Sequence, residues 1–506
     1  MAFWNKKEKE PQRKPVKRKS TRSFYNAWMA AVTDNLTESW TRSSTPINEQ
    51  IKNDLETLRA RSRDLAKNDP HVRKFIRLMK ANIVGRSGVM LQSKVKNPNG
   101  TIDTVASNAI ELAWKEFGKW GIASRTNDKT FVDLQGLFWD HILRDGEVLI
   151  LKVANDTVNR FGYGLQFIDP EQLSVKCNLT LKSGNKVRMG VELDDFNAPI
   201  AYHLTSTNTA HSAFYQFEGK GYIRISADKV IHRFFSEYAD QVRGVPEVAS
   251  VLNRLKNLDG YEEAEIVSKR VSASKMGFFS RNAEGQGYDG ADYDDGTESE
   301  AVSMDARPGI IDELPHDVNF SVFDPSHDGA SYDAFVKSAL KSISAGLGVS
   351  YHSLANDLEG VNYSSGRLGA LEDRDNYMFL QDWFINCFIE PVFREWVESA
   401  VLRGQINIPS GGTLRLGDID RYKDANFQAR RWLWVDPQKD MTANEKAVAL
   451  GLTSRAAIIR EQGRDPEDVF REIAEENKRL EELGISQQPA QAGFLLPDEQ
   501  EETEDE

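Results

Sequence analysis

Residues 344–367 read SAGLGVSYHSLANDLEGVNYSSGR, and they determine how the rest of the chain is interpreted. A helical pattern comes before this stretch, and Gly346 and Gly348 are expected to end it because glycine disfavours helix continuation. A polar run from Asn356 to Gly366 follows. A long apolar pattern then begins at Arg367. The stretch therefore predicts a helix, a polar loop and a second, longer helix.

The second helix is predicted over about 367–403 and is the most apolar in the chain. Its large side chains point in several directions: Leu371, Phe379, Trp383, Phe388, Val392, Phe393, Trp396 and Val397. Such a helix is typically buried on most of its circumference. Pro391 predicts a kink. The helix would run roughly 50 Å, a length that favours burial in a large assembly.

Before residue 344, two helical patterns enclose a small β-rich insert. Pro246 opens a helix that continues to about Lys275. Strands are then predicted at 277–280, 308–311 and 318–322, with an acidic, glycine-rich loop at 282–300. The helix that follows this insert begins near Ala330.

The N-terminal half predicts an α+β region whose strand order cannot be read. A helical pattern over 55–83 is broken at Asn68-Asp69-Pro70, where Asp69 is a helix cap and Pro70 occupies the first helical position. Another helix is expected at 130–143. Strands are expected at 148–151, 164–168 and 230–234.

The sequence from Thr442 to Leu483 predicts a small cap made of helices. Thr442-Ala443-Asn444-Glu445 has the pattern of a capping box. Gly463 ends a second helix, and Asp465-Pro466 opens a third. The third helix is expected to turn these side chains inward: Val469, Phe470, Ile473, Leu480 and Leu483.

Charge gathers at the two ends of the chain. Residues 1–22 are rich in Lys and Arg, whereas seven carboxylates lie between Asp498 and Glu506. Both ends are predicted to be disordered. The basic arm is either a solvated tail or a segment that touches DNA or an acidic partner.

The composition indicates a globular protein of 506 residues with a net charge of −13. That charge argues against a broad basic surface for nucleic acid, but it does not exclude a protein that only surrounds DNA. Cys177 and Cys387 are too few for a disulfide framework. No run of about 18 apolar residues and no signal peptide is present, so no membrane association is expected.

A search for chemistry gives no catalytic, cofactor or metal site. The sequence has no phosphate-binding Gly-x4-Gly-Lys-Ser/Thr motif and no Gly-x-Ser-x-Gly motif. Its eight histidines are scattered without metal-ligand spacing. Asp194-Asp195 and Asp294-Asp295 are adjacent carboxylates, but the first lies in a predicted hairpin turn and the second in the acidic loop. No enzyme activity is expected.

Several motifs together resemble the lambda-like family of tailed-phage portal proteins. They are the stretches 58–65, 68–70, 82–85, 88–93, 145–147, 165–171, 243–246, 344–351, 362–367 and 463–469. The resemblance covers about residues 55–484. It implies an α+β portal fold with a wing, stem helices, a β-rich clip, a long kinked wing helix and a helical crown, assembled as a ring.

The resemblance also implies domain boundaries. They are a flexible basic arm at 1–45, an α+β wing at 46–246, a first stem helix at 247–275, a clip at 276–327, a second stem helix at 328–346, a tunnel loop at 347–366, the long helix and remaining wing at 367–438, a helical crown at 439–484 and a disordered acidic tail at 485–506.

The function implied is that of a head–tail connector. Twelve copies would form a ring at the portal vertex of the virion, after assembly in the host cytoplasm, and double-stranded DNA would be packaged and ejected through it. Expected partners are the terminase large subunit at the clip, a head–tail adaptor protein, and the major capsid protein and scaffold.

The residues expected to face the channel fall into two sets. The tunnel-loop set is Asn356, Asp357, Glu359, Asn362, Tyr363, Ser364, Ser365 and Arg367. The stem-helix set is Arg254, Lys256, Lys269, Arg270, Lys337 and Lys341. An equally good interpretation is that the stem cations pair with acidic neighbours at helical spacing, such as Glu262, Glu263 and Glu265.

Two other functions stay open at this point. One is a packaging enzyme, either a nuclease or an ATPase, although the missing phosphate loop argues against the ATPase. The other is a different capsid structural protein, such as a scaffold or decoration protein. Metal-dependent cleavage of DNA would support a nuclease, and a lattice or filament in place of a ring would support the second.

Overall fold

The computed structural model describes residues 44–205, 221–273, 277–281, 318–322, 329–409, 411–432 and 437–483. The basic arm up to residue 43, the acidic loop 282–300, the expected strand at 308–311 and the tail 485–506 lie outside these ranges. The described part is α+β, as predicted. None of its helices is both long and apolar enough to cross a membrane.

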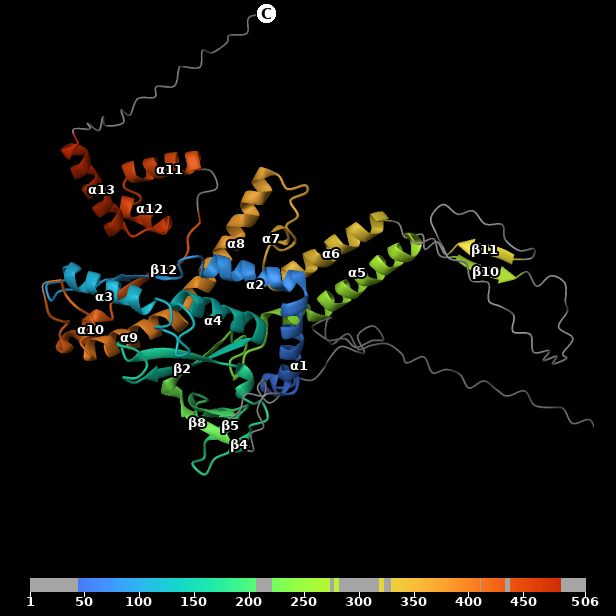
Figure 1. The fold of residues 1–506 in the computed structure, drawn as a ribbon, viewed down its shortest axis with the longest axis horizontal. Helices are drawn as coiled ribbons and strands as arrows, with labels where there is room; N and C mark the ends of the chain where they lie inside the picture. The colour runs from blue at the N-terminus through green and yellow to red at the C-terminus, as the bar shows by residue number, and fades with distance from the viewer. Residues whose placement is uncertain are drawn as a thin grey trace, which may run out of the picture.

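The main body combines helices with two antiparallel sheets (Figure 1). Its helices are α1 (Ile47–Asn68), α2 (Pro70–Ile83), α3 (Thr104–Phe117), α4 (Phe131–Asp145), α8 (Tyr363–Phe384), α9 (Glu390–Leu402) and α10 (Ile419–Tyr422). One sheet has the order β3-β2-β9, built from β2 (Glu147–Ala154), β3 (Tyr163–Ile168) and β9 (Val230–Phe234). The other has the order β4-β5-β6-β7-β8, built from β4 (Leu179–Thr180), β5 (Lys186–Arg188), β6 (Val191–Leu193), β7 (Pro199–Thr205) and β8 (Tyr222–Ser226).

The expected strands at 148–151, 164–168 and 230–234 are confirmed as β2, β3 and β9. The expected helix at 130–143 is α4, and Thr130 caps it by accepting a hydrogen bond from the Asp133 amide. The break at Asp69 is also confirmed, since the Asp69 side chain accepts from the Val72 amide at 2.8 Å. Helix α1 begins at Ile47 and not near Leu55, because its first turns bury Ile51 against the sheets.

A second part of the molecule is the helix pair that leaves the body (Figure 1). A 3₁₀ turn (Glu247–Val251) leads into α5 (Leu252–Ala273), and α6 (Gly329–Leu347) returns beside it. Leu255, Leu258, Leu340 and Ile343 are buried near the root of the pair. Further out, the Tyr261 ring lies 4.7 Å from that of Phe335. Beyond the pair, β10 (Gly277–Arg281) pairs with β11 (Val318–Val322), which confirms the expected strands at 277–280 and 318–322.

The long helix predicted over 367–403 runs without a break from Tyr363 to Leu402, but its α-helical hydrogen-bonding pattern is interrupted. A π-helical turn, Ile385–Ile389, separates α8 from α9 immediately before Pro391. Proline has no N–H, so the carbonyl four residues earlier loses its helical partner. That carbonyl belongs to Cys387, and it accepts a hydrogen bond from Arg233 Nε at 3.0 Å. The interruption lies where Pro391 predicted a kink.

Burial along this helix differs from the prediction. Phe388, Val392, Phe393 and Trp396 are fully buried, and the Trp396 ring lies 4.9 Å from that of Trp114 on α3. In α8, however, Phe379 is 69% exposed. The expectation of burial on most sides is therefore right for α9 and wrong for α8, where Leu371 and Phe379 are exposed.

The C-terminal helices form a separate small layer (Figure 1), comprising α11 (Pro437–Ala449), α12 (Arg455–Glu461) and α13 (Pro466–Glu482). Gly463 and Asp465-Pro466 end and begin helices as predicted. The capping box at Thr442 is wrong, because α11 begins earlier and the Thr442 hydroxyl donates to the Gln438 carbonyl inside the helix.

The inward face expected for α13 is also wrong within the subunit. Phe470, Ile473 and Leu483 are exposed, and Val469 and Leu480 are only partly covered. Below this layer, β1 (Met90–Ser93) pairs with β12 (Ala425–Gln428).

A buried carboxylate, Glu147, joins the body to the root of the helix pair. Both of its oxygens accept from Arg243 Nε, at 2.8 and 2.9 Å. Arg59 Nη2 donates to it at 2.9 Å, and His232 Nε2 lies 3.1 Å away. The Gly244 amide donates at 3.1 Å. Helix α1, strand β9 and the segment Arg243-Gly244 therefore converge on this one side chain of β2.

A second cluster extends this network toward the surface. Arg63 donates to Asp145 at 2.6 Å, to Asp169 at 2.7 Å and to Glu171 at 2.8 Å. We call the whole set the ionic junction: Arg59, Arg63, Asp145, Glu147, Asp169, Glu171, His232 and Arg243. Its members come from motifs that the sequence places far apart.

Two glycines let the chain segments approach closely at the ionic junction. Gly146 has φ +84°, and a Cβ there would lie 2.2 Å from the Val245 carbonyl carbon. A Cβ on Gly244 would lie 2.0 Å from the Gly146 oxygen. Both positions therefore require glycine, and Pro246 then begins the path into α5.

The ionic junction shifts the titration of its own groups. Burial alone would raise the pKa of Glu147, but the charges of Arg243 and Arg59 and the hydrogen bond from His232 hold it well below its usual value. Burial would also raise the pKa of Asp145, and hydrogen bonds from His141 and Arg144 lower it. Desolvation lowers the pKa of His232.

We predict that Glu147→Gln destabilises the protein by about 3–5 kcal/mol, because it leaves two buried arginine charges without their carboxylate. The free energy of unfolding from denaturant titration measures this. The matched control is Glu56→Gln, which removes an exposed ion pair with Lys176 at 3.2 Å and is expected to cost less than about 1 kcal/mol. Equal losses in the two variants would contradict the role given to Glu147.

We also predict that stability falls as the pH is lowered. The carboxyl groups of Glu147 and Asp145 have depressed pKa values, so their contribution is present above the unfolded pKa of about 4 and is lost below it. Burial lowers the pKa of His232 in the fold, so protonation favours the unfolded chain as the pH falls below the unfolded pKa of about 6.5. The free energy of unfolding, measured from neutral to acidic pH, should fall less steeply in Glu147→Gln than in the wild type.

Candidate functional site

The segment expected to form a tunnel loop, 347–366, is only partly a loop. It contains a short helix, α7 (Tyr351–Ala355), which Ser350 caps by accepting from the Ser353 amide. At its other end α8 begins at Tyr363, so Tyr363, Ser364 and Ser365 lie in the first helical turn. The prediction of a continuous loop is therefore wrong at both ends, and the loop proper is Asn356–Asn362.

Two local motifs explain these helix boundaries. Asn362 accepts from the Ser365 amide at 2.8 Å, and Ser365 Oγ accepts from the Asn362 amide at 3.2 Å, which makes a capping box. In α8, Asp373 accepts from the Ser350 hydroxyl at 2.7 Å and from the Ser353 hydroxyl at 2.9 Å. The start of α7 is thereby fastened to α8.

The loop proper is held by short-range hydrogen bonds. The Tyr351 hydroxyl donates to Asp357 Oδ2 at 2.7 Å, and the Glu359 amide donates to Asp357 Oδ1 at 2.9 Å. His352 Nδ1 lies 2.7 Å from the Asp357 carbonyl oxygen. The hydrogen bond from Tyr351 also lowers the pKa of the Asp357 carboxyl. Asp357 therefore organises the loop.

The loop is also tied to its neighbours. Lys74 of α2 donates to Asn356 Oδ1 at 2.9 Å, and Asn356 adopts a left-handed conformation with φ +56°. Lys337 of α6 donates to Glu359 at 2.7 Å. Between these contacts Leu358 is 71% exposed. The channel residues predicted from the sequence do not include Leu358, because that prediction selected polar side chains.

The stem cations are partly neutralised within the subunit. Lys256 pairs with Asp259 at 3.0 Å, Lys269 with Glu265 at 3.5 Å and Lys337 with Asp333 at 3.0 Å. Arg367 lies 3.5 Å from Asp440. For these residues the structure favours the pairing interpretation over free phosphate contacts. Arg270 likewise has an intramolecular interaction.

Two of the expected cations have neutral partners. Arg254 Nη1 donates to the Ser342 hydroxyl at 2.6 Å. Lys341 lies over the Tyr351 ring, 5.6 Å from its centre. Among the described residues, no carboxylate contacts either of these two charges. The structure brings Lys337 and Lys341 together with the loop, whereas Lys269 and Arg270 lie toward the distal end of α5 (Figure 1).

The residues considered for metal or catalytic chemistry have structural roles where they are described. Asp194 lies in the turn between β6 and β7, where it accepts from the Phe196 and Ala198 amides at 2.8 Å. Within the described ranges, no group of three or more His, Cys, Asp or Glu residues is arranged to hold a metal ion. Asp294-Asp295 lies outside them.

Comparisons with known proteins connect this arrangement to a family. Residues 33–381 match the family model described as phage portal protein, lambda family. A probable portal protein of Halomonas phage phiHAP-1 is 32% identical over 94% of this chain and 90% of its own length. Portal protein B of Escherichia phage lambda is 21% identical over 88% of each chain.

Among solved structures, a chain from the neck of an empty GTA particle is 13% identical and has a TM-score of 0.42. The match covers 85% of this chain and 97% of that one. Because this likeness is slight, the family assignment rests on the sequence matches.

We predict that Tyr351→Phe loosens the loop without unfolding the protein, because only the hydroxyl that donates to Asp357 is lost. Amide hydrogen exchange over residues 356–362 should become about fivefold faster, as expected for the loss of roughly 1 kcal/mol of hydrogen bonding. Tyr238→Phe, at a tyrosine that is 54% exposed, is the control. Unchanged exchange in Tyr351→Phe would show that the loop is held by other contacts.

Proposed function

The chain belongs to the lambda family of phage portal proteins, and from this we propose that it forms the ring channel at one vertex of the capsid. Double-stranded DNA enters the head through this ring during packaging and leaves through it during ejection. The observation that carries the proposal is the 32% identity with a portal protein across 94% of the chain. A ring of twelve subunits in the virion is part of the proposal.

Exposed apolar side chains on the isolated subunit support a ring. On α8, Leu368 and Phe379 are each 69% exposed. In the C-terminal helices the exposed apolar residues are Met441, Leu450, Leu452, Phe470, Ile473 and Leu483. A closed ring uses two different faces of each subunit in head-to-tail contacts. These surfaces suit contacts of that kind.

The channel role is assigned to α5, α6 and the loop Asn356–Asn362. Sliding DNA requires a wall that makes weak and exchangeable contacts at every register. The ion pairs of Lys256, Lys269 and Lys337 reduce the number of strong phosphate contacts that this wall can make. Arg254 and Lys341, which have neutral partners, are the cations left to touch phosphates.

The remaining assignments follow the proposed domain map. The clip, 276–327, docks the terminase large subunit and later the head–tail adaptor. The wing, 46–246 with 367–438, faces the major capsid protein and scaffold. The helices within 439–484 form the crown. The role is structural: the ring guides DNA and performs no chemical step.

Electron microscopy of the purified full-length protein tests the proposal. The expected result is closed rings with a central hole, and capsids assembled with the protein should carry one such ring. Monomers at every salt concentration, together with failure to join capsids, would overturn it. A lattice or filament would point to another structural role.

We predict that Phe379→Asp lowers the ring fraction at least about tenfold, because burying an unpaired carboxylate at a subunit contact costs several kcal/mol. Mass photometry measures the ring fraction. The control is Phe196→Asp, at the 91% exposed tip of the hairpin between β6 and β7, which should leave the rings intact. Normal rings in Phe379→Asp would remove α8 from the subunit interface.

A further inference from the structure

A pocket of about 610 Å³ lies where the end of α2 meets the C-terminal helices. It is lined by Ala81, Val84, Gly85, Arg86, Ser87, Gly88, Met90, Ala429, Arg430, Arg431, Gln462 and Gly463. The lining contains three arginines and no carboxylate. The chain as a whole has a net charge of −13, whereas the charge of this lining is positive.

Within the part of the chain that the structure describes, no carboxylate contacts the arginines of this pocket. Arg430 Nη1 donates to the Ala81 carbonyl and, at 3.1 Å, to Asn82 Oδ1. Arg431 Nη1 donates to Gln381 Oε1 at 3.2 Å. All three acceptors are uncharged. Arg86 is exposed, and its side chain has no ion pair or hydrogen bond within the described part of the chain.

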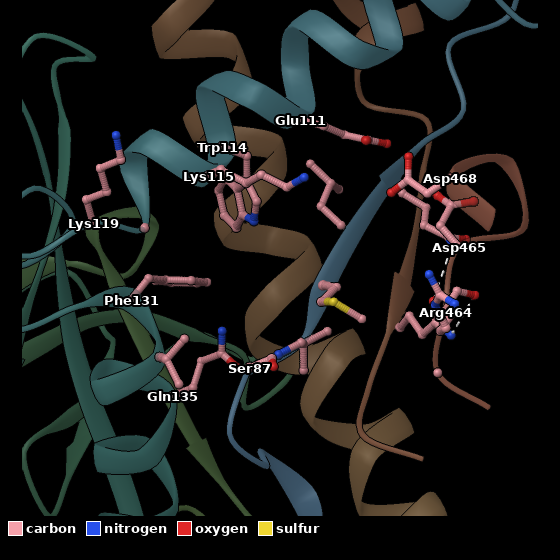
Figure 2. A pocket seen from close by; sticks show the side chains of 18 of the residues that line it. Ser87, Glu111, Trp114, Lys115, Lys119, Phe131, Gln135, Arg464, Asp465 and Asp468 are labelled. Atoms are coloured by element: carbon pink, nitrogen blue, oxygen red, sulfur yellow. Dashed lines mark hydrogen bonds between the residues drawn. The ribbon is translucent and has the colours of Figure 1, made fainter. Parts of the chain in front are cut away.

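The neighbouring pocket provides an internal comparison (Figure 2). It is about 450 Å³ in volume and shares Ser87, Met90 and Gly463 with the first pocket. Its wall carries the carboxylates Glu111, Asp465, Asp468 and Glu472, and Arg464 there pairs with Glu472. The pocket around Arg86 therefore differs from this neighbour in having no carboxylate in its lining.

The glycine turn just before Arg86 lets the Arg430 side chain lie close to the backbone of the pocket. Gly85 has φ +71°, and a Cβ at this position would lie 3.0 Å from both Cβ and Cδ of Arg430. The Arg430 side chain thus packs against the bare turn. Gly88, with φ +68°, lets the chain turn again into β1. Ser87 and Gln462 add neutral hydrogen-bond donors to the same lining.

We propose that Arg86, Arg430 and Arg431 form a binding site for a backbone phosphate of double-stranded DNA. Guanidinium groups bind phosphate oxygens through paired hydrogen bonds, and the charge assists each bond. The site reads no bases, because phosphate contacts carry no sequence information. It is separate from the loop Asn356–Asn362, and it adjoins the helices proposed as the crown.

DNA is favoured as the source of the phosphate because the proposed function brings DNA to this protein; the inference rests on that function. In a ring, every subunit presents the same pocket, so individually weak sites act together on one duplex. One exposed and two half-buried arginines per subunit can hold DNA loosely while the acidic remainder of the surface keeps it mobile.

The test uses assembled rings of the full-length protein and a short fluorescent DNA duplex. Arg86→Ala should weaken binding at least about tenfold at low salt, since one charge-assisted contact per subunit is lost. The dependence of log K on log salt should become shallower by about 0.9 for each phosphate contact removed. Arg86→Ala/Arg431→Ala should weaken binding further. Arg430 is left intact because it also fastens the end of α2.

Arg61→Ala, at an exposed arginine of α1, is the matched control and should bind DNA like the wild type. Inorganic phosphate is the second probe: if it competes with the duplex only in proteins that retain Arg86, the pocket is the phosphate site. Equal affinity and salt dependence in Arg86→Ala, Arg61→Ala and the wild type would overturn the proposal.

Other outcomes separate this inference from the proposed function. If Arg86→Ala reduces ring assembly while the rings that form bind DNA normally, the pocket receives a carboxylate of a neighbouring subunit and the phosphate proposal is wrong. Failure of the portal function would appear instead as an absence of rings in the wild type. Normal rings whose DNA binding does not depend on Arg86 would contradict only the inference made here.

Discussion

The placement of the helix pair α5–α6 depends on one buried charge, that of Glu147. An isolated carboxylate at this position would be strongly unfavourable, because it loses its hydration and gains nothing in return. Arg59, Arg243, His232 and the Gly244 amide supply that compensation together. Helix α1, strand β9 and the root of α5 are therefore positioned by the same group, and none of them can move far without exposing an unpaired charge.

From this fixed root, the contacts lead outward to the candidate channel. Helix α6 packs against the 3₁₀ turn that leads into α5, where a Cβ on Gly346 would lie 2.5 Å from Val251 Cγ1. Lys337 connects α6 to the loop through Glu359, and Asp373 connects α7 to α8. A shift of α6 would therefore displace the loop as well. At the tip of the loop, Leu358 is exposed and accessible to another molecule.

Charge and apolar surface are distributed unevenly over the subunit. Most of the cations expected in the channel are paired with carboxylates. Within the described residues, by contrast, Arg430 and Arg431 donate only to uncharged acceptors, and the Arg86 side chain has no ion pair or hydrogen bond. Apolar side chains that a monomer would bury, such as Phe379 and Phe470, are exposed. A head-to-tail ring offers an explanation for the second pattern, since each subunit then has two neighbours to cover such surfaces.

The sequence by itself determined the α+β class, the helix boundaries at Asp69-Pro70 and Asp465-Pro466, and the strands β2, β3 and β9, because caps and apolar runs act within a few residues. Their short range also explains the wrong prediction at Thr442: the local pattern is that of a cap, but it lies inside a helix that begins earlier. Only the tertiary structure decided the strand order, the exposure of Phe379 and the ionic junction. Glu147 lies 88 residues from Arg59 and 96 from Arg243, and a contact across such separations depends on how the whole chain packs.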